Sequence, residues 1–127
     1  MSHEALYRLS ADMPELLWLR PKTIDKAHLL EALSQALNWP DYFGANWDAA
    51  WDCLSDPALM QAEARLGLHL ATEALVDQDD LRSFLELIEE AAVLWQEQDA
   101  LLQMFIYHQR SDLALLEPIP LWLNTQA

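Results

Sequence analysis

The sequence predicts an α/β fold in which a small parallel sheet of about three strands is packed by helices. Short apolar runs rich in strand-forming residues alternate with longer segments whose apolar residues recur every three or four positions. Strands separated by helices imply βαβ crossovers and hence a mainly parallel sheet. Only two glycines occur in 127 residues, which favours helices joined by short polar links. The length fits one domain spanning residues 1–127.

Three short runs are predicted to be strands. LLWL, at 16–19, is closed by Arg20-Pro21 and is too short for a stable helix. RLGLHLA, at 65–71, alternates apolar with other residues, and LLQMFIYH, at 101–108, is rich in residues that favour strands. An earlier run at 5–9 indicates either a further strand or a flexible arm.

Two long segments are predicted to be helices. The first has about three turns, begins after Asp25 as the N-cap and is stopped before Pro40. The second covers 80–98, because its apolar residues recur at helical spacing: Leu81, Phe84, Leu85, Ile88, Ala91, Ala92 and Trp95.

The strands place the expected core at about 16–108. An N-terminal arm, 1–15, and a C-terminal tail, 109–127, flank this core. Pro118 and Pro120 exclude a regular helix in the tail, although the apolar residues that follow them could dock on the body. The sequence leaves the packing of both flanking segments open.

Charge and composition exclude several classes of function. With 21 Asp and Glu against seven Lys and Arg, the net charge is −14, so direct binding to nucleic acid is not expected. Such a field would steer a basic protein partner, although acidity that only maintains solubility is the simpler alternative. The single Cys53 forms no internal disulfide, and the start lacks a signal peptide, which points to the cytoplasm. No apolar run approaches the roughly 20 residues needed to span a membrane.

A third helix is predicted within PDYFGANWDAAWDCLSD, residues 40–56. Asn46 is a favourable N-cap, and Gly44 before it allows a backbone turn that a side chain would obstruct. The helix is expected from Trp47 to about Ser55.

On a helical projection, this short helix has two distinct sides. Ala50, Cys53 and Leu54 cluster with Trp47 on the side predicted to face the core. The acids of the opposite side are Asp48, Asp52 and Asp56, and Trp51 lies on the border between the two sides. Asp48 and Asp52 are one turn apart, where like charges destabilise a helix by about 0.2–0.5 kcal/mol.

Three general interpretations of the acidic side compete. It is a solvated charged face, a divalent-metal site or a pair of catalytic carboxylates. The metal site is disfavoured because neither Glu-x-x-His nor His-Glu-x-x-His occurs, and catalysis because no second group or phosphate-binding glycine loop accompanies the acids. Cys53 lies on the core side without a nearby His, and His69 and His108 fall in predicted strands as packing residues. We therefore expect no cofactor, no metal and no enzymatic activity.

The same residues carry a resemblance to a known family. LNWPDYFGANWDAAWDCLSD, at 37–56, resembles the signature of the barstar family, intracellular inhibitors of barnase-type ribonucleases. The family pattern is Leu-x-x-Pro-acid-Tyr-aromatic-Gly-x-Asn-x-Asp-Ala-x-Trp-Asp-Cys-Leu, and the match is dense and without gaps. The order of strands and helices is similar to the barstar fold over about 16–108.

The resemblance implies both a fold and a binding face. The fold would be a three-layer barstar-like arrangement with a small parallel sheet packed by helices. The binding face would be the short acidic helix and the loop before it, with Asp52 entering the ribonuclease active site in place of a substrate phosphate. The residues carried over to this face are Tyr42, Gly44, Asn46, Asp48, Trp51 and Asp52, with Glu90 of the late helix added more weakly.

The chain also departs from the family pattern. Asp56 stands where barstar has a glycine followed by a tryptophan, and Leu94 stands where a second acid of the late helix is expected. The insertion PALMQAEA is not barstar-like either. The resemblance therefore implies a cytoplasmic, immunity-type inhibitor of a basic, barnase-like ribonuclease. The alternative is a barstar-fold module that binds another basic protein without inhibiting a nuclease.

Overall fold

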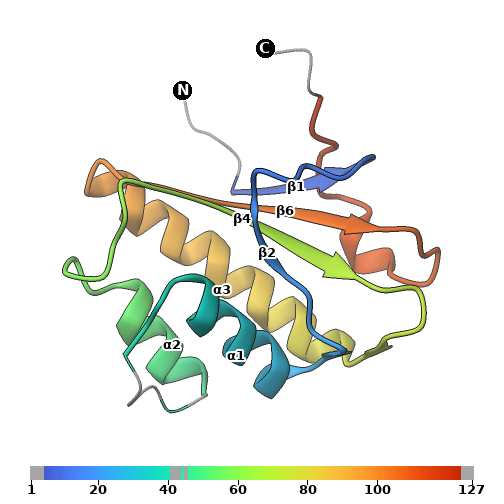
Figure 1. Ribbon diagram of the computed structural model, residues 1–127, viewed down its shortest axis with the longest axis horizontal. Coiled ribbons are helices and arrows are strands. Elements are labelled where there is room, and N and C mark those ends of the chain that lie inside the picture. The colour runs from blue at the N-terminus through green and yellow to red at the C-terminus, as the bar shows by residue number, and fades with distance from the viewer. Residues whose placement is uncertain (1–4, 41–43, 45, 124–127) are drawn as a thin grey trace.

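The computed structural model describes residues 5–40, 44 and 46–123 of the chain. Groups of strands are separated by helices along this length (Figure 1). Their order is β1 (Leu6–Leu9), β2 (Leu17–Leu19), β3 (Thr23–Ile24), α1 (Lys26–Ala36), α2 (Trp47–Leu54), β4 (Glu63–Leu70), β5 (Leu75–Val76), α3 (Gln78–Glu97), β6 (Leu101–His108) and a 3₁₀ turn, η1 (Ala114–Leu116).

The main sheet has four strands in the order β1-β6-β4-β2, and every neighbouring pair is parallel. Leu66 of β4 is in register with Met104 of β6 on one side and with Leu17 of β2 on the other. β3 and β5 form a second, two-stranded parallel sheet. The predicted α/β class with a parallel sheet is confirmed.

Each predicted strand corresponds to a strand of the main sheet. The runs at 16–19, 65–71 and 101–108 are β2, β4 and β6, within two residues at each end. The run at 5–9, for which a strand and a flexible arm were both open, contains β1, a fourth strand at the edge of the sheet. β3 and β5 were not predicted, because two residues are too few to show a period.

The helices begin where capping side chains predict. Asp25 accepts a 3.0 Å hydrogen bond from the backbone N–H of His28 at the start of α1. The His28 ring also lies 2.7 Å from the same carboxylate, so the Asp25-x-x-His28 pair is a cap. Asp77 caps α3 by accepting from the N–H of Asp80, which is why this helix begins two residues before the predicted start at 80.

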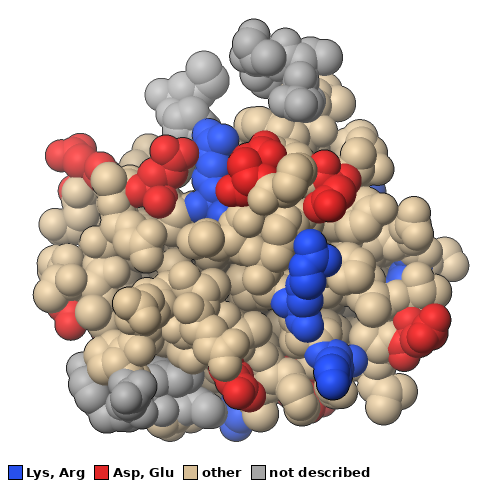
Figure 2. Space-filling model, in the orientation of Figure 1, with Lys and Arg blue, Asp and Glu red and all other residues tan. Residues whose placement is uncertain are grey.

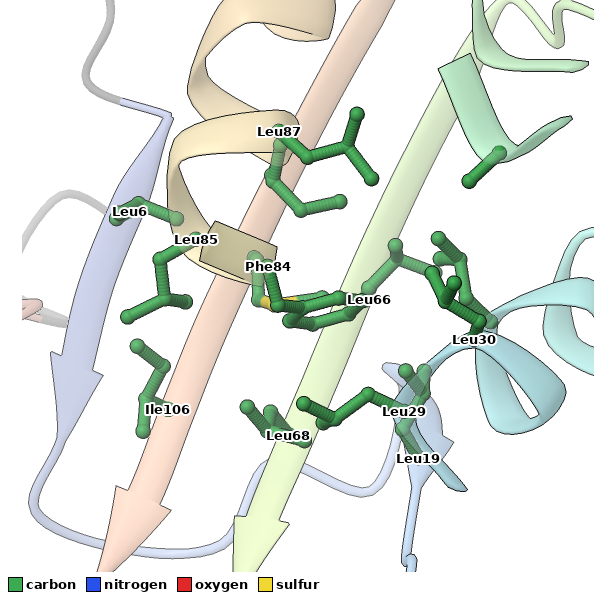
Figure 3. Close-up of a cluster of buried hydrophobic side chains, with 14 of the residues drawn as sticks. Leu6, Leu19, Leu29, Leu30, Leu66, Leu68, Phe84, Leu85, Leu87 and Ile106 are labelled. Atoms are coloured by element: carbon green, nitrogen blue, oxygen red, sulfur yellow. The ribbon is translucent and has the colours of Figure 1, made fainter. Parts of the chain in front are cut away.

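All three helices lie on the same side of the main sheet (Figure 1). The main hydrophobic core lies between them and the sheet, and Figure 3 shows Phe84 of α3 against Leu66 of β4. Phe84, Leu66 and Leu29 of α1 have no exposed surface. Burial at the helix–sheet interface is therefore what holds α1 and α3 in place.

The opposite face of the sheet carries a smaller cluster that contains no residue of α1, α2 or α3. Leu9, Leu16 and Phe105 are its buried members, and its partly buried members are Tyr7, Met13, Trp18, Tyr107 and Trp122. The resemblance implied three layers. Helices and strands form two layers. On the face without helices, the third layer is a thin cover formed by Met13 and Leu16, between β1 and β2, and by Trp122 of the tail.

The core extends beyond the expected 16–108 in both directions. Leu6, Leu113 and Leu116 are buried members of the main core. The tail also pairs with β1: the N–H of Arg8 donates to the carbonyl of Pro120, and the N–H of Trp122 donates to the carbonyl of Arg8, both at 2.8 Å. The C-terminal tail thus pairs with the outer edge of β1, a strand that itself belongs to the N-terminal segment. Among the helices of the described residues, none combines the length and the apolar character needed to cross a bilayer.

Candidate functional site

The short acidic helix, α2, begins at an asparagine cap. The Asn46 side chain accepts a 2.8 Å hydrogen bond from the N–H of Ala49, as the sequence predicted. The reason given for Gly44 is wrong. Gly44 does not have a positive φ, and among the described residues a Cβ there would come near only the Asn46 amide, at an ordinary 3.8 Å. Tyr42 lies outside the described residues.

The core-facing side of α2 is as predicted. Ala50 and Leu54 are fully buried, and Cys53 is nearly so. Trp47 and Trp51 are partly buried and pack against the same core. Trp51 thus lies on the border between the buried and the exposed sides, where the helical projection placed it.

The outer side of α2 presents two unpaired carboxylates. Asp48 and Asp52 are both exposed, and neither has a hydrogen bond or ion pair from its side chain to another described residue. Asp56 differs from them, because it is half-buried and accepts a 2.9 Å hydrogen bond from the N–H of Ala58. Asp56 therefore stabilises the turn after α2, whereas Asp48 and Asp52 have no such bond within the described residues.

A buried hydrogen bond joins the end of α2 to α3. The indole N–H of Trp95 in α3 donates a 2.8 Å hydrogen bond to the carbonyl of Leu54, the last residue of α2. Both residues are buried almost completely. Sequence reasoning predicted only that Trp95 is apolar at a helical position, since a hydrogen bond across 41 residues leaves no local signal.

Glu90 lies on the outer surface of α3, the helix that packs against α2. Its place in a binding face shared with Asp48 and Asp52 stays a prediction.

Cys53 has the surroundings of a structural residue. Burial, together with the charges of Asp52 and Asp56, raises the pKa of the Cys53 thiol. A raised pKa disfavours the nucleophilic thiolate. Within the described residues, no cluster of three or more His, Cys, Asp or Glu side chains is arranged to hold a metal ion.

Acidic side chains are spread widely over the face seen in Figure 2. They form several separate groups, with Lys and Arg between some of them. The net charge of −14 thus acts over a broad area, while short-range contacts depend on particular carboxylates.

Comparisons with known proteins identify one family. Residues 20–107, more than half of the chain, match the family model described as Barstar (barnase inhibitor). The matched range includes β3, β4, β5, all three helices and β6 up to its last residue but one, and it begins directly after β2. Comparisons with curated proteins and with solved structures gave no match.

Proposed function

Because the chain belongs to the barstar family, we propose that it inhibits a ribonuclease by covering the cationic active site of the enzyme with the acidic side of α2. The observation that carries this proposal is the pair of exposed, unpaired carboxylates of Asp48 and Asp52 beside Trp51, on a helix fixed to the core through Leu54. The family description names a ribonuclease inhibitor, and the geometry of α2 suits that task.

The chemistry of a ribonuclease supports this assignment. An enzyme that cleaves RNA must surround the transferring phosphoryl group with Lys, Arg or His side chains. A carboxylate held on a rigid helix can form charge-assisted hydrogen bonds with the same groups. Asp52 is the residue proposed to enter that site, and Asp48 and Trp51 are proposed to contact its rim.

The remaining predicted contacts belong to the same proposal. Tyr42, Gly44 and Asn46 would lie at the loop side of the interface, and Glu90 at the side of α3. The proposed complex is one to one, needs no cofactor and forms in the cytoplasm, with the nuclease as a protein partner and no direct contact to nucleic acid or membrane. The net charge of −14 would accelerate encounter with a basic enzyme.

The experiment is capture of the partner followed by an activity assay. Tagged wild-type chain and a D48N/D52N variant would be used in parallel to capture proteins from cells that encode this chain. We expect the wild type alone to retain a basic protein that cleaves RNA after release and is inhibited when wild-type chain is added back. A captured basic protein without RNA cleavage would support the alternative, a barstar-fold module with another target. Equal capture by both chains would exclude α2 as the binding face.

A further inference from the structure

The chain leaves β1 and β6 toward opposite faces of the sheet, although these two strands are neighbours. After β1, Met13 and Leu16 pack in the cluster on the face without helices. After β6, Leu113 and Leu116 pack in the main core on the helical face. In open parallel sheets, a crevice forms where adjacent strands diverge in this way, at their carboxyl ends, and such crevices commonly bind ligands.

A cavity of about 270 Å³ lies at this position. Arg8, near the end of β1, and His108, the last residue of β6, line it together with Arg110 and Ser111. Leu113 and Leu116 supply an apolar wall, and Glu117 is the single carboxylate among the lining residues. Two of the seven basic side chains of this acidic protein therefore line one small cavity.

The guanidinium of Arg110 already has hydrogen-bond acceptors within the protein. Its guanidinium donates to the carbonyls of Ala71 and Ala74 and, through two nitrogens, to the carboxylate of Asp112. These bonds account for the placement of Arg110 and leave its charge neutralised by Asp112.

The guanidinium of Arg8 has fewer acceptors. Its Nε donates to the carbonyl of Ile119, but its two terminal nitrogens have no acceptor among the described residues. No described carboxylate, Glu117 included, lies within ion-pair distance of Arg8. The guanidinium thus has a full charge and unused donors at the cavity.

His108 supplies a second donor. Its Nδ1 accepts a 3.0 Å hydrogen bond from the N–H of Arg110, so in the neutral ring the proton is on Nε2. Burial and the charges of Arg8 and Arg110 lower the pKa of His108, against the opposing effect of Asp112. The Nε2–H has no acceptor among the described residues.

We propose that this crevice binds a small oxyanion, a phosphate or carboxylate group held between the terminal nitrogens of Arg8 and the Nε2–H of His108. A guanidinium fork matches the geometry of both anions. The volume suits a small molecule rather than a polymer, and Leu113 and Leu116 would contact its carbon skeleton. The site is separate from α2 and does not depend on the proposed function.

The test is a titration followed by NMR at the His108 ring and the neighbouring amides. Inorganic phosphate, glycerol phosphate and acetate are added separately at constant ionic strength, with chloride as the control anion. We expect saturable shifts at His108 with at least one oxyanion, accompanied by a rise in the pKa of the ring. The anion that binds most tightly distinguishes a phosphate site from a carboxylate site.

Two pairs of variants separate binding from folding. R8Q should weaken binding about tenfold, whereas R65Q, which removes the same charge from an exposed residue of β4, should change it less than about twofold. Glu117 is exposed, so E117Q is expected to keep the fold, and it should strengthen binding about two- to fivefold by removing the one lining carboxylate, relative to E73Q on an exposed loop. Shifts no larger than those with chloride, or equal affinities of E117Q and E73Q, would overturn the proposal.

Discussion

The indole N–H of Trp95 and the carbonyl of Leu54 form a buried 2.8 Å hydrogen bond that joins the last turn of α3 to the end of α2. The last carbonyls of a helix have no partner within the helix, so a buried one needs a donor from elsewhere. Trp95 supplies that donor from α3. The acidic side of α2 is therefore presented on a helix whose end is fixed.

The first prediction concerns this hydrogen bond. W95F leaves the buried carbonyl of Leu54 without its donor, and we expect a loss of about 1–3 kcal/mol in the free energy of unfolding. Urea unfolding measures it. W122F is the matched control, because the buried indole N–H of Trp122 has no hydrogen-bond partner among the described residues. Equal losses in the free energy of unfolding for the two variants would mean that the volume of the Trp95 ring, and not its hydrogen bond, stabilises the fold.

The second prediction separates Asp52 from general acidity. If Asp52 is desolvated against cationic groups of the partner, D52N should weaken binding by about 2–5 kcal/mol, a range for which barnase and barstar are themselves the reference case. The loss should appear mainly as faster dissociation. E73Q changes the net charge equally from an exposed loop and should affect only the association rate. Surface plasmon resonance measures both rates, and similar losses would contradict an active-site role for Asp52.

The third prediction concerns Trp51, which is partly buried beside the acidic side. W51F keeps most of the contact with the core but removes the outer edge of the indole. We expect affinity to fall by about 1–2 kcal/mol, as for partial truncation of an interface aromatic residue. Calorimetry of the free protein is the accompanying measurement. A lower melting temperature with unchanged affinity would assign Trp51 to the core alone.

The fourth prediction concerns the face without helices. A Cβ at Gly67 would lie 2.5 Å from the ring of Trp18, whose indole N–H donates to the carbonyl of Met13. G67A must therefore displace Trp18, and we expect a loss of about 1–3 kcal/mol from overpacking. In a W18L background the same substitution should cost much less, because the ring is absent. Additive losses in the double variant would contradict this explanation.

The fifth prediction is a pH dependence from His108. Its pKa is below the ordinary value of 6.5, mainly through burial, so the unfolded chain takes up a proton at a higher pH than the folded one. The folded state holds His108 in its neutral form, and the resulting contribution to the free energy of unfolding is complete above pH 6.5. It is lost as the pH falls through that value toward the lower pKa of the folded state. In H108N, the amide oxygen can still accept a hydrogen bond from the N–H of Arg110, but the side chain does not titrate. Wild type should therefore lose stability relative to H108N as urea unfolding is repeated from about pH 8 down to about pH 5. Parallel curves would contradict the prediction.

The sequence by itself determined β2, β4 and β6, the three helices and the two sides of α2. Periodicity and capping are local properties, so Asp25, Asn46 and the buried positions Ala50 and Leu54 could be predicted from neighbours a few residues away. The motif at 37–56 also indicated the family. The role assigned to Gly44 failed because a glycine in a loop does not by itself require a positive φ.

Only the tertiary structure decided which distant residues meet. The bond from Trp95 to Leu54, the pairing of Arg8 with Pro120 and Trp122, and the approach of Arg8 to His108 join segments far apart in the chain. Such contacts depend on strand order: β1 lies beside β6 although β1 ends at Leu9 and β6 begins only at Leu101. Local patterns determine the elements, whereas burial of the combined surfaces selects their neighbours, because that free energy exists only once the elements pack.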